Sequence, residues 1–337
     1  MSPIEPGRPP LEVRFKRGRV VESQHRVHAV VTDACGGLAG SWGDAQWVTV
    51  LRSVAKPFQA LPLVGDGAAQ RFGLSDKEIA LCCGSHNSEE THMEAARSIL
   101  AKAGVPEELL VCGAHAPLLA ARRDELSAAG TPWSPLMCNC SGKHAGMLAL
   151  AAFHGWPLQG YERVDHPLQR RMGREVAKWT GVPRSEMVWE TDGCGVPTFA
   201  LPLASLAHGV ARLAVAARSE GPPRDVVRAM TCHPFMVAGT GRLCTRLMEE
   251  EGSRVFAKVG AEGVYVAGDL KRGMGVALKV EDGAWRAAPP ALMAVLGRAG
   301  ILSSGARRAL GDFSEPVLRN TLGEEVGRVS VEEARCS

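Results

Sequence analysis

The sequence lacks the features that mark a membrane, a secreted or a nucleic-acid-binding protein. Its 337 residues contain no run of about 18 apolar residues, so we expect no membrane-spanning helix. The first residues, MSPIEPGRPPLEVRF, have no apolar core of a signal peptide. The formal net charge is only +3 and both signs are interspersed, whereas phosphate binding needs a concentrated basic face. We therefore expect a cytoplasmic protein whose partners include neither a membrane nor nucleic acid.

The composition is that of an ordinary globular protein. Hydrophobic residues make up 45% of the chain and charged residues 22%. The ten cysteines of a cytoplasmic protein should be reduced, and therefore buried, catalytic or metal-bound rather than paired in disulfides.

A Gly-rich phosphate loop and a strict strand–helix alternation are also missing, which disfavours a doubly wound nucleotide-binding fold. Strand-like runs lie instead near both ends of the chain, at about 11–52 and 253–281, and helical patterns fill roughly 53–250. Strands segregated in this way favour an α+β fold. We expect one domain over 1–337, with an antiparallel sheet built from both chain ends, flanking helices and a mostly helical middle subdomain.

A serine and a lysine three residues apart, Ser53 and Lys56, stand where a strand-like run gives way to a helical one in LRSVAKPFQ. Pro57 suits the first turn of the helix expected to open at Ser53. The positive end of that helix favours developing negative charge on the serine, and Lys56 can activate it only if its pKa is lowered. An isolated Ser-x-x-Lys is more often an ordinary N-cap.

Two later sequence motifs follow the Ser-x-x-Lys motif. CGSHNSEE contains Ser85-His86-Asn87, and a probable strand contains Lys258-Val259-Gly260. Ser-x-x-Lys, Ser-x-Asn and Lys-x-Gly follow one another in this order in the penicillin-recognising serine hydrolases. Val259 departs from the Ser or Thr usual there, which weakens a β-lactam interpretation. The plain alternatives are a turn serine at Ser85 and a solvated strand lysine at Lys258.

A cysteine-containing segment, MCNCSGKHAGML, places Cys140 and Lys143 at the start of a helix, with His144 next. In WETDGCGVPTF, Cys194 sits in a Gly-rich turn two residues after Asp192. Thiolates, imidazole and carboxylate suit Zn²⁺, but the Cys-x₂-Cys pair of a zinc finger is lacking. From spacing alone, buried structural thiols are the better interpretation.

Taken together, these segments resemble the rhizobial-type (class 3, asparaginase II) L-asparaginases from about 52 to 265, with HPLQ, GTGR and AKVGAEGVY as further matches. The resemblance implies a serine β-lactamase/DD-peptidase-like fold, hydrolysis of L-asparagine to L-aspartate and ammonia, and a homodimer.

The resemblance also implies the site residues. It gives two Ser–Lys tandems, Ser53 with Lys56 and Ser85 with Lys258. It gives a Zn²⁺ site beside them, formed by Cys140, Lys143 and Cys194. Asp192 and His144 would lie around the metal and the substrate. The candidates for reading the substrate's α-ammonium and α-carboxylate are Arg52, Asp192 and Arg242, and Asn87 completes the expected substrate-binding set.

Three questions stay open at this stage. The chain is expected to be an L-asparagine amidohydrolase, but another serine hydrolase of the same fold, a glutaminase or a peptidase-like acylase, is the nearest alternative. A non-catalytic zinc or thiol sensor built on CNCSGKH and DGCG is the alternative of a different class. The sequence does not decide which serine is acylated first, or what Cys138 does.

Overall fold

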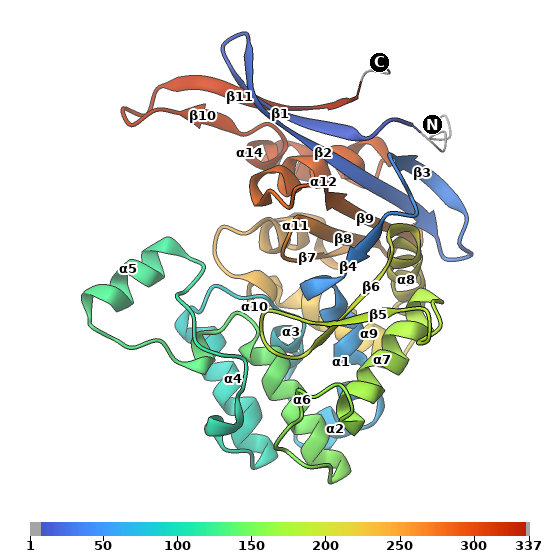
Figure 1. Ribbon diagram of the computed structural model, residues 1–337, viewed down its shortest axis with the longest axis vertical. Helices are drawn as coiled ribbons and strands as arrows, with labels where there is room; N and C mark the ends of the chain where they lie inside the picture. The colour runs from blue at the N-terminus through green and yellow to red at the C-terminus, as the bar shows by residue number, and fades with distance from the viewer. Residues whose placement is uncertain (1–7, 335–337) are drawn as a thin grey trace. The chain divides into compact units, whose positions relative to one another are not determined.

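The structure, a computed structural model, describes residues 8–334. The chain divides into two units (Figure 1). The first unit comprises Met1–Val54, Leu201–Val215 and Arg246–Ser337, and the second comprises Ala55–Ala200 and Ala216–Thr245. The boundary between Val54 and Ala55 falls inside the Ser-x-x-Lys string. The single domain expected over 1–337 stays a prediction.

The first unit is built on an eight-stranded sheet in the order β10-β11-β1-β2-β9-β8-β7, with β3 paired to β2. Its pairs are antiparallel. The strands are β1 (Leu11–Arg17), β2 (Val20–Asp33), β3 (Leu38–Trp42), β7 (Val255–Val259), β8 (Val264–Asp269), β9 (Met274–Val280), β10 (Val317–Arg319) and β11 (Glu325–Glu333). The expected α+β class, with an antiparallel sheet formed from both chain ends and flanked by helices, is confirmed.

Helices flank this sheet within the first unit. Helix α12 (Ala288–Arg298) packs on β9, β11 and β1. Helix α8 (Leu203–Ala216) lies against β9 at Gly275, where an added Cβ would stand 2.1 Å from the Ala207 carbonyl oxygen. A glycine is therefore required for the helix to approach this strand so closely.

The second unit is mainly helical. Its helices are α1 (Lys56–Gly65), α2 (Ala68–Arg71), α3 (Asp76–Cys82), α4 (Glu90–Ala103), α5 (Ala120–Ala128), α6 (Ser141–His154), α7 (Pro167–Thr180), α9 (Pro222–Cys232) and α10 (Pro234–Ala238). Strand β5 (Val188–Thr191) pairs with β6 (Pro197–Pro202). The remaining elements are β4 (Val48–Val50), α11 (Leu243–Glu251), α13 (Ser304–Ala309) and α14 (Gly311–Ser314).

Helix α6 is the central helix of the second unit, and it packs on α1, α3 and α4. Two glycines allow it to lie close to α3. A Cβ at Gly142 would stand 2.4 Å from Leu81 Cγ, and one at Gly146 would stand 2.6 Å from Cys82 Sγ. The first turn of α6, which carries Lys143, is fixed by this close approach.

Three features differ from the sequence-based expectations. The α-helix begins at Lys56 rather than Ser53, because Arg52–Ala55 forms a 3₁₀ turn ahead of it. The middle of the chain also contains the hairpin β5–β6, and β10 and β11 follow the last predicted helix. Strand β11, EVGRVSVEE, escaped prediction because it is charged and only partly buried, so its apolar alternation is weak.

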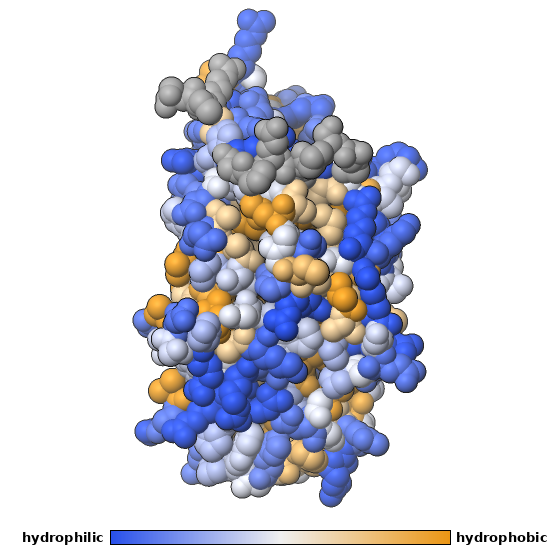
Figure 2. Space-filling view, turned by 90° about the vertical axis from the view of Figure 1, so that its right-hand side faces the viewer, coloured by the Kyte–Doolittle hydropathy of each residue, from blue (hydrophilic) through white to orange (hydrophobic). Residues whose placement is uncertain are grey.

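The surface mixes apolar and polar residues. On the face shown in Figure 2, hydrophobic and hydrophilic residues are interspersed. Exposed large apolar side chains, such as Val48, Val188 and Trp285, are dispersed along the chain. Over residues 8–334 we find no helix with the length and apolarity that crossing a membrane requires.

Candidate active site

Lys56 contacts one of the predicted serines. It is the first residue of α1 and is fully buried. Its ammonium donates hydrogen bonds to Ser85 Oγ at 3.0 Å, to the Asn139 carbonyl oxygen at 3.5 Å and to the Gly84 carbonyl oxygen. A buried cation needs such partners, and here they place it directly on a serine hydroxyl.

The loop between α3 and α4 holds Ser85 by its backbone. The Ser85 N–H donates to the Val237 carbonyl at 2.8 Å, and the His86 N–H donates to the Asn139 carbonyl at 3.2 Å. A side chain at Gly84 would lie 2.7 Å from the Met236 carbonyl oxygen. The serine is therefore clamped between α10 and the turn that precedes α6.

His86, which the sequence did not single out, ties this loop to α6. Its Nδ1 accepts the Ser88 N–H at 3.1 Å, and its Nε2 lies 2.9 Å from Ser141 Oγ. Burial holds the pKa of His86 well below its usual value, so the ring is neutral. With Nδ1 as the acceptor, Nε2 carries the proton and donates it to Ser141.

Asn87 and Arg242, two of the predicted substrate-binding residues, hydrogen-bond to each other. Arg242 Nη1 donates to Asn87 Oδ1 at 3.0 Å, and Asn87 Nδ2 donates to the Thr240 carbonyl at 3.0 Å. The Thr240 N–H and hydroxyl in turn donate to the Glu89 carboxylate at 3.0 and 2.6 Å. Gly239, at φ +99°, makes the turn that allows this link.

The two halves of the predicted metal site meet in the second unit. Lys143 Nζ lies 2.9 Å from Cys194 Sγ, and the nearby Cys140 contributes to raising the pKa of both groups. Asp192 Oδ2 is 3.6 Å from Cys194 Sγ. Cys140 occupies the position just before α6, whereas Cys194 lies in the turn between β5 and β6, where Gly195 has φ +88°. Two segments about fifty residues apart thus bring two thiols, an amine and a carboxylate together.

The electrostatics of this cluster bear on metal binding. Burial alone would lower the pKa of Lys143, but its interactions with Cys194, Cys140 and Asp192 raise it above its ordinary value. Hydrogen bonds from Cys138 and Cys194 hold the pKa of Cys140 well below that of a free thiol. A metal ion here must therefore displace a proton from Lys143.

The nitrogen and sulfur atoms of this cluster are ligands that Zn²⁺ prefers, and the distance between them is close to the distance that Zn²⁺ requires. With bonds of about 2.1 Å to nitrogen and 2.3 Å to sulfur, two tetrahedral ligands stand about 3.6 Å apart. The Lys143–Cys194 pair would therefore open by less than about 1 Å. Within residues 8–334, no group of three or more His, Cys, Asp or Glu side chains could hold a metal ion.

His144, the neighbour of Lys143, is fully buried. Its Nδ1 lies 2.6 Å from the hydroxyl of Tyr161, which also accepts the Val111 N–H at 3.3 Å. Burial holds the pKa of His144 well below its usual value. Its Nε2 has no hydrogen-bond partner among the residues that the structure describes. Tyr161 was missed because no local motif surrounds it.

Ser53 and Lys258 both belong to the first unit. Ser53 is buried in the 3₁₀ turn, next to Arg52, whose φ of +50° is rare for a residue other than glycine. Lys258 is fully buried on β7, as predicted for a strand, and donates to the Val259 carbonyl at 2.6 Å. Gly260 lies beside Leu51, since an added Cβ would be 3.2 Å from the Leu51 oxygen. The Lys-x-Gly string therefore adjoins the segment that carries Ser53.

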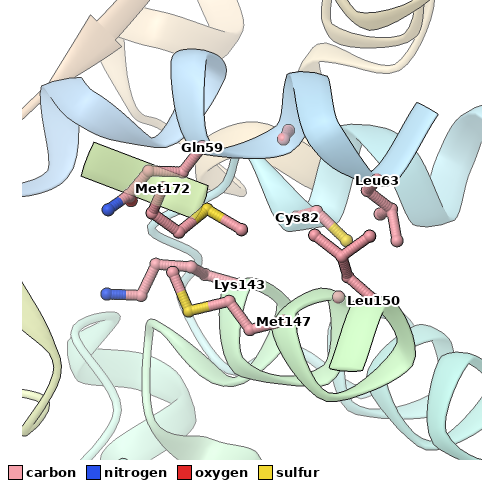
Figure 3. Close-up of a pocket in the computed structure, with 9 residues that line it drawn as sticks. Gln59, Leu63, Cys82, Lys143, Met147, Leu150 and Met172 are labelled. Atoms are coloured by element: carbon pink, nitrogen blue, oxygen red, sulfur yellow. The ribbon is translucent and has the colours of Figure 1, made fainter. Parts of the chain in front are cut away.

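A small cavity beside Lys143 does not serve as the substrate pocket. Apolar and sulfur-containing side chains surround most of it, among them Leu63, Cys82, Met147 and Met172. Figure 3 shows the ammonium of Lys143 and the amide of Gln59 together on one side, away from Leu63 and Leu150. The cavity measures about 10 Å³, which admits little more than one water molecule.

Comparison with known proteins identifies the family. The sequence matches the L-asparaginase II family over residues 13–331. The chain belongs to the L-asparaginase II family, which makes it a hydrolase by class and confirms the resemblance seen in its motifs. A comparison with curated proteins gives no significant match.

Similar solved structures include hydrolases. A putative β-lactamase from Bacteroides dorei DSM 17855 is 14% identical, with a TM-score of 0.40 over 87% of this chain and 93% of that chain. A hydrolase with promiscuous acyltransferase activity is 12% identical, with a TM-score of 0.39 over 84% and 93%. A β-lactamase from Mycobacterium bovis is 12% identical, with a TM-score of 0.31 over 86% and 95%. The family assignment rests on the sequence match alone.

Proposed function

We propose that the protein hydrolyses L-asparagine to L-aspartate and ammonia through a serine and a lysine. One observation carries the proposal. The buried ammonium of Lys56, three residues after Ser53, lies 3.0 Å from Ser85 Oγ in a chain of the L-asparaginase II family. A lysine enclosed in this way is placed to transfer protons between hydroxyls.

In the proposed reaction, Ser53 Oγ attacks the carbon of the side-chain carboxamide while Lys56, in its neutral form, takes the hydroxyl proton. The tetrahedral oxyanion is stabilised by backbone N–H groups of the turn around Ser53. The carbon–nitrogen bond then breaks, and Lys56 returns the proton to the leaving ammonia. Water, deprotonated by the same lysine, hydrolyses the acyl-enzyme and releases aspartate.

Ser85 is proposed to relay protons to Lys56, an assignment that their hydrogen bond supports. The tandem of Ser85 with Lys258 stays a prediction, as does the order in which the serines react. Substrate binding is assigned to the set Arg52, Asn87, His144, Asp192 and Arg242. The link between Asn87 and Arg242 supports a joint role for these two residues.

We further propose that Cys140, Lys143 and Cys194 hold Zn²⁺. When bound, the ion supplies positive charge that attracts the oxygens of the substrate. If its role is to hold the substrate, a chelator should raise KM more than it lowers kcat. A Cys194→Ser variant should show the higher KM from the outset and no further response to the chelator. A homodimer and a cytoplasmic location stay predictions.

The test is ammonia release from L-asparagine and, side by side, from L-glutamine. Wild type, Ser53→Ala and Ser85→Ala are compared, with zinc supplied. Turnover of asparagine that disappears in Ser53→Ala supports the proposal, because loss of the nucleophile costs several orders of magnitude in rate. Turnover that survives in Ser53→Ala but disappears in Ser85→Ala moves the nucleophile to Ser85.

The other outcomes select the alternatives. Preference for glutamine, or for a longer acyl substrate in a panel of amides, would make the protein a glutaminase or acylase. One methylene changes specificity only modestly, so the ratio of kcat/KM values is the quantity to compare. No ammonia from any amide, together with retained zinc binding, would leave the zinc or thiol sensor.

A further inference from the structure

An excursion of the second unit begins and ends at a cysteine. Residues 113–137, here called the arm, leave the unit after Cys112 and return to it at Cys138. Helix α5 lies in the arm and buries a single residue, Leu126 (Figure 1). The arm is thus attached mainly by its base, and a link formed there would act on the whole excursion.

The two cysteines contact each other at this base. Cys138 Sγ lies 3.5 Å from the Cys112 carbonyl oxygen, and Cys112 Sγ lies 3.3 Å from the Pro135 carbonyl oxygen. Both cysteines are buried, at 5% and 1% exposed. A disulfide requires the Cβ atoms to be about 3.5–4.5 Å apart, and the contact between Cys138 Sγ and the Cys112 carbonyl oxygen places the two residues side by side.

Other interactions also hold the arm: Ser88 Oγ donates to the Met137 carbonyl at its base, and Arg122 on α5 pairs with Glu90 on α4 at 2.8 Å. His115 Nε2 accepts the Asn139 N–H at 3.1 Å, directly after Cys138. Cys138 also lies two residues before Cys140, a predicted metal ligand. Cys112 and Cys138 take no part in the proposed hydrolysis, and the mechanism leaves their side-by-side placement unexplained.

We propose that Cys112 and Cys138 form a reversible disulfide that closes the arm at its base. The oxidant is a peroxide. One thiol sulfur attacks a peroxide oxygen and becomes a sulfenic acid as one water leaves, and the second sulfur displaces a second water and forms the S–S bond. In total, two thiols and one hydrogen peroxide give one disulfide and two waters, so the two sulfurs supply the two electrons. A dithiol reductant restores both thiols by exchange.

Two consequences follow from the geometry. The disulfide removes the Cys138 S–H group that donates to the Cys112 carbonyl oxygen, and it converts residues 112–138 into a covalently closed loop. Neither consequence depends on whether the chain hydrolyses asparagine, because both concern only thiol chemistry and the arm.

Trypsin provides the test, because Arg123 on α5 is an exposed cleavage site that lies between the two cysteines. Full-length protein is treated with hydrogen peroxide or with dithiothreitol, its remaining thiols are blocked, and it is nicked briefly with trypsin. The fragments are then separated in detergent without reductant. We expect the two fragments to remain joined after peroxide treatment and to separate after dithiothreitol treatment. Peptide mapping of the joined fragments should find Cys112 linked to Cys138.

Matched variants complete the experiment. Cys112→Ser and Cys138→Ser should each give separate fragments after peroxide, whereas Cys232→Ser, which removes an exposed cysteine outside the arm, should behave as wild type. Separate fragments from peroxide-treated wild type, or a link through other cysteines, would overturn the proposal. If a serine variant fails to fold, complete digestion and peptide mapping of the oxidised wild type tests the proposal directly, because the mapping shows whether Cys112 is linked to Cys138.

Discussion

Replacing Lys56 by methionine separates a catalytic lysine from a structural one. Methionine keeps an unbranched side chain of similar length in the buried site but removes the ammonium. If Lys56 transfers protons in the reaction, kcat should fall by about 10²–10⁴-fold, which is the usual contribution of a general acid–base group.

The effect on stability should be small by comparison. The substitution leaves the carbonyls of Gly84 and Asn139 and the hydroxyl of Ser85 without their donor. Each unpaired buried group costs about 1–3 kcal/mol. Removing a buried charge offsets this cost, because desolvating an ion costs several kcal/mol. We therefore expect the free energy of unfolding to change by about 2 kcal/mol or less, against a total of about 5–15 kcal/mol.

The assays are ammonia release at saturating asparagine and the urea midpoint of unfolding. Lys102→Met is the matched control, since Lys102 lies on α4 of the same unit and pairs with Glu78 at 2.7 Å. It should lose about 1 kcal/mol or less of stability and keep its kcat. A Lys56→Met protein that retains more than about a tenth of wild-type kcat would refute the proton-transfer role. Loss of activity together with the unfolding transition would show a structural role instead.

Three further predictions concern the second unit. Gly142→Ala should lower the free energy of unfolding by about 1–3 kcal/mol, because its Cβ would lie 2.6 Å from the Leu81 carbonyl oxygen; urea titration measures this. Ser75→Ala should cost about 1 kcal/mol in the same assay, since it removes the capping box of α3, and should leave kcat unchanged. Burial alone would raise the pKa of Asp66, but hydrogen bonds led by that from Arg171 lower it below 3.8. The ionised carboxylate therefore stabilises the folded protein above about pH 4, and this stability is lost as the pH falls through the pKa of Asp66 in the folded state. In Arg171→Gln, the urea midpoint of unfolding should depend less on pH across that range.

Sequence reasoning predicted those parts of the site whose structure is determined by residues close to them in the sequence. Pro57 marked the first turn of α1, the Gly-rich turn marked Cys194, and the strand around Lys258 was evident from its apolar residues. The family resemblance, and not the spacing, indicated that Cys140 and Cys194 belong together. Their meeting depends on how α6 and the β5–β6 hairpin pack.

The features that sequence reasoning missed depend on tertiary packing. The hydrogen bond between Lys56 and Ser85 joins α1 to a loop beyond α3, and nothing in either segment specifies the other. Tyr161 meets His144 only through the fold. The start of α1 was misplaced because a 3₁₀ turn and an α-turn share their local propensities.

The pairing of β1 with β11 has a consequence for the order of folding during synthesis. Leu11 lies opposite Glu333 and Arg17 lies opposite Gly327, so β1 pairs with a strand that is made more than 300 residues later. The second unit, which ends at Thr245, is complete in sequence well before β11 leaves the ribosome. Until then one edge of β1 stays unpaired, and an unpaired edge is a site for pairing with other chains. Stalling translation after α12 should therefore yield a nascent chain whose second unit resists protease while β1 remains open to aggregation.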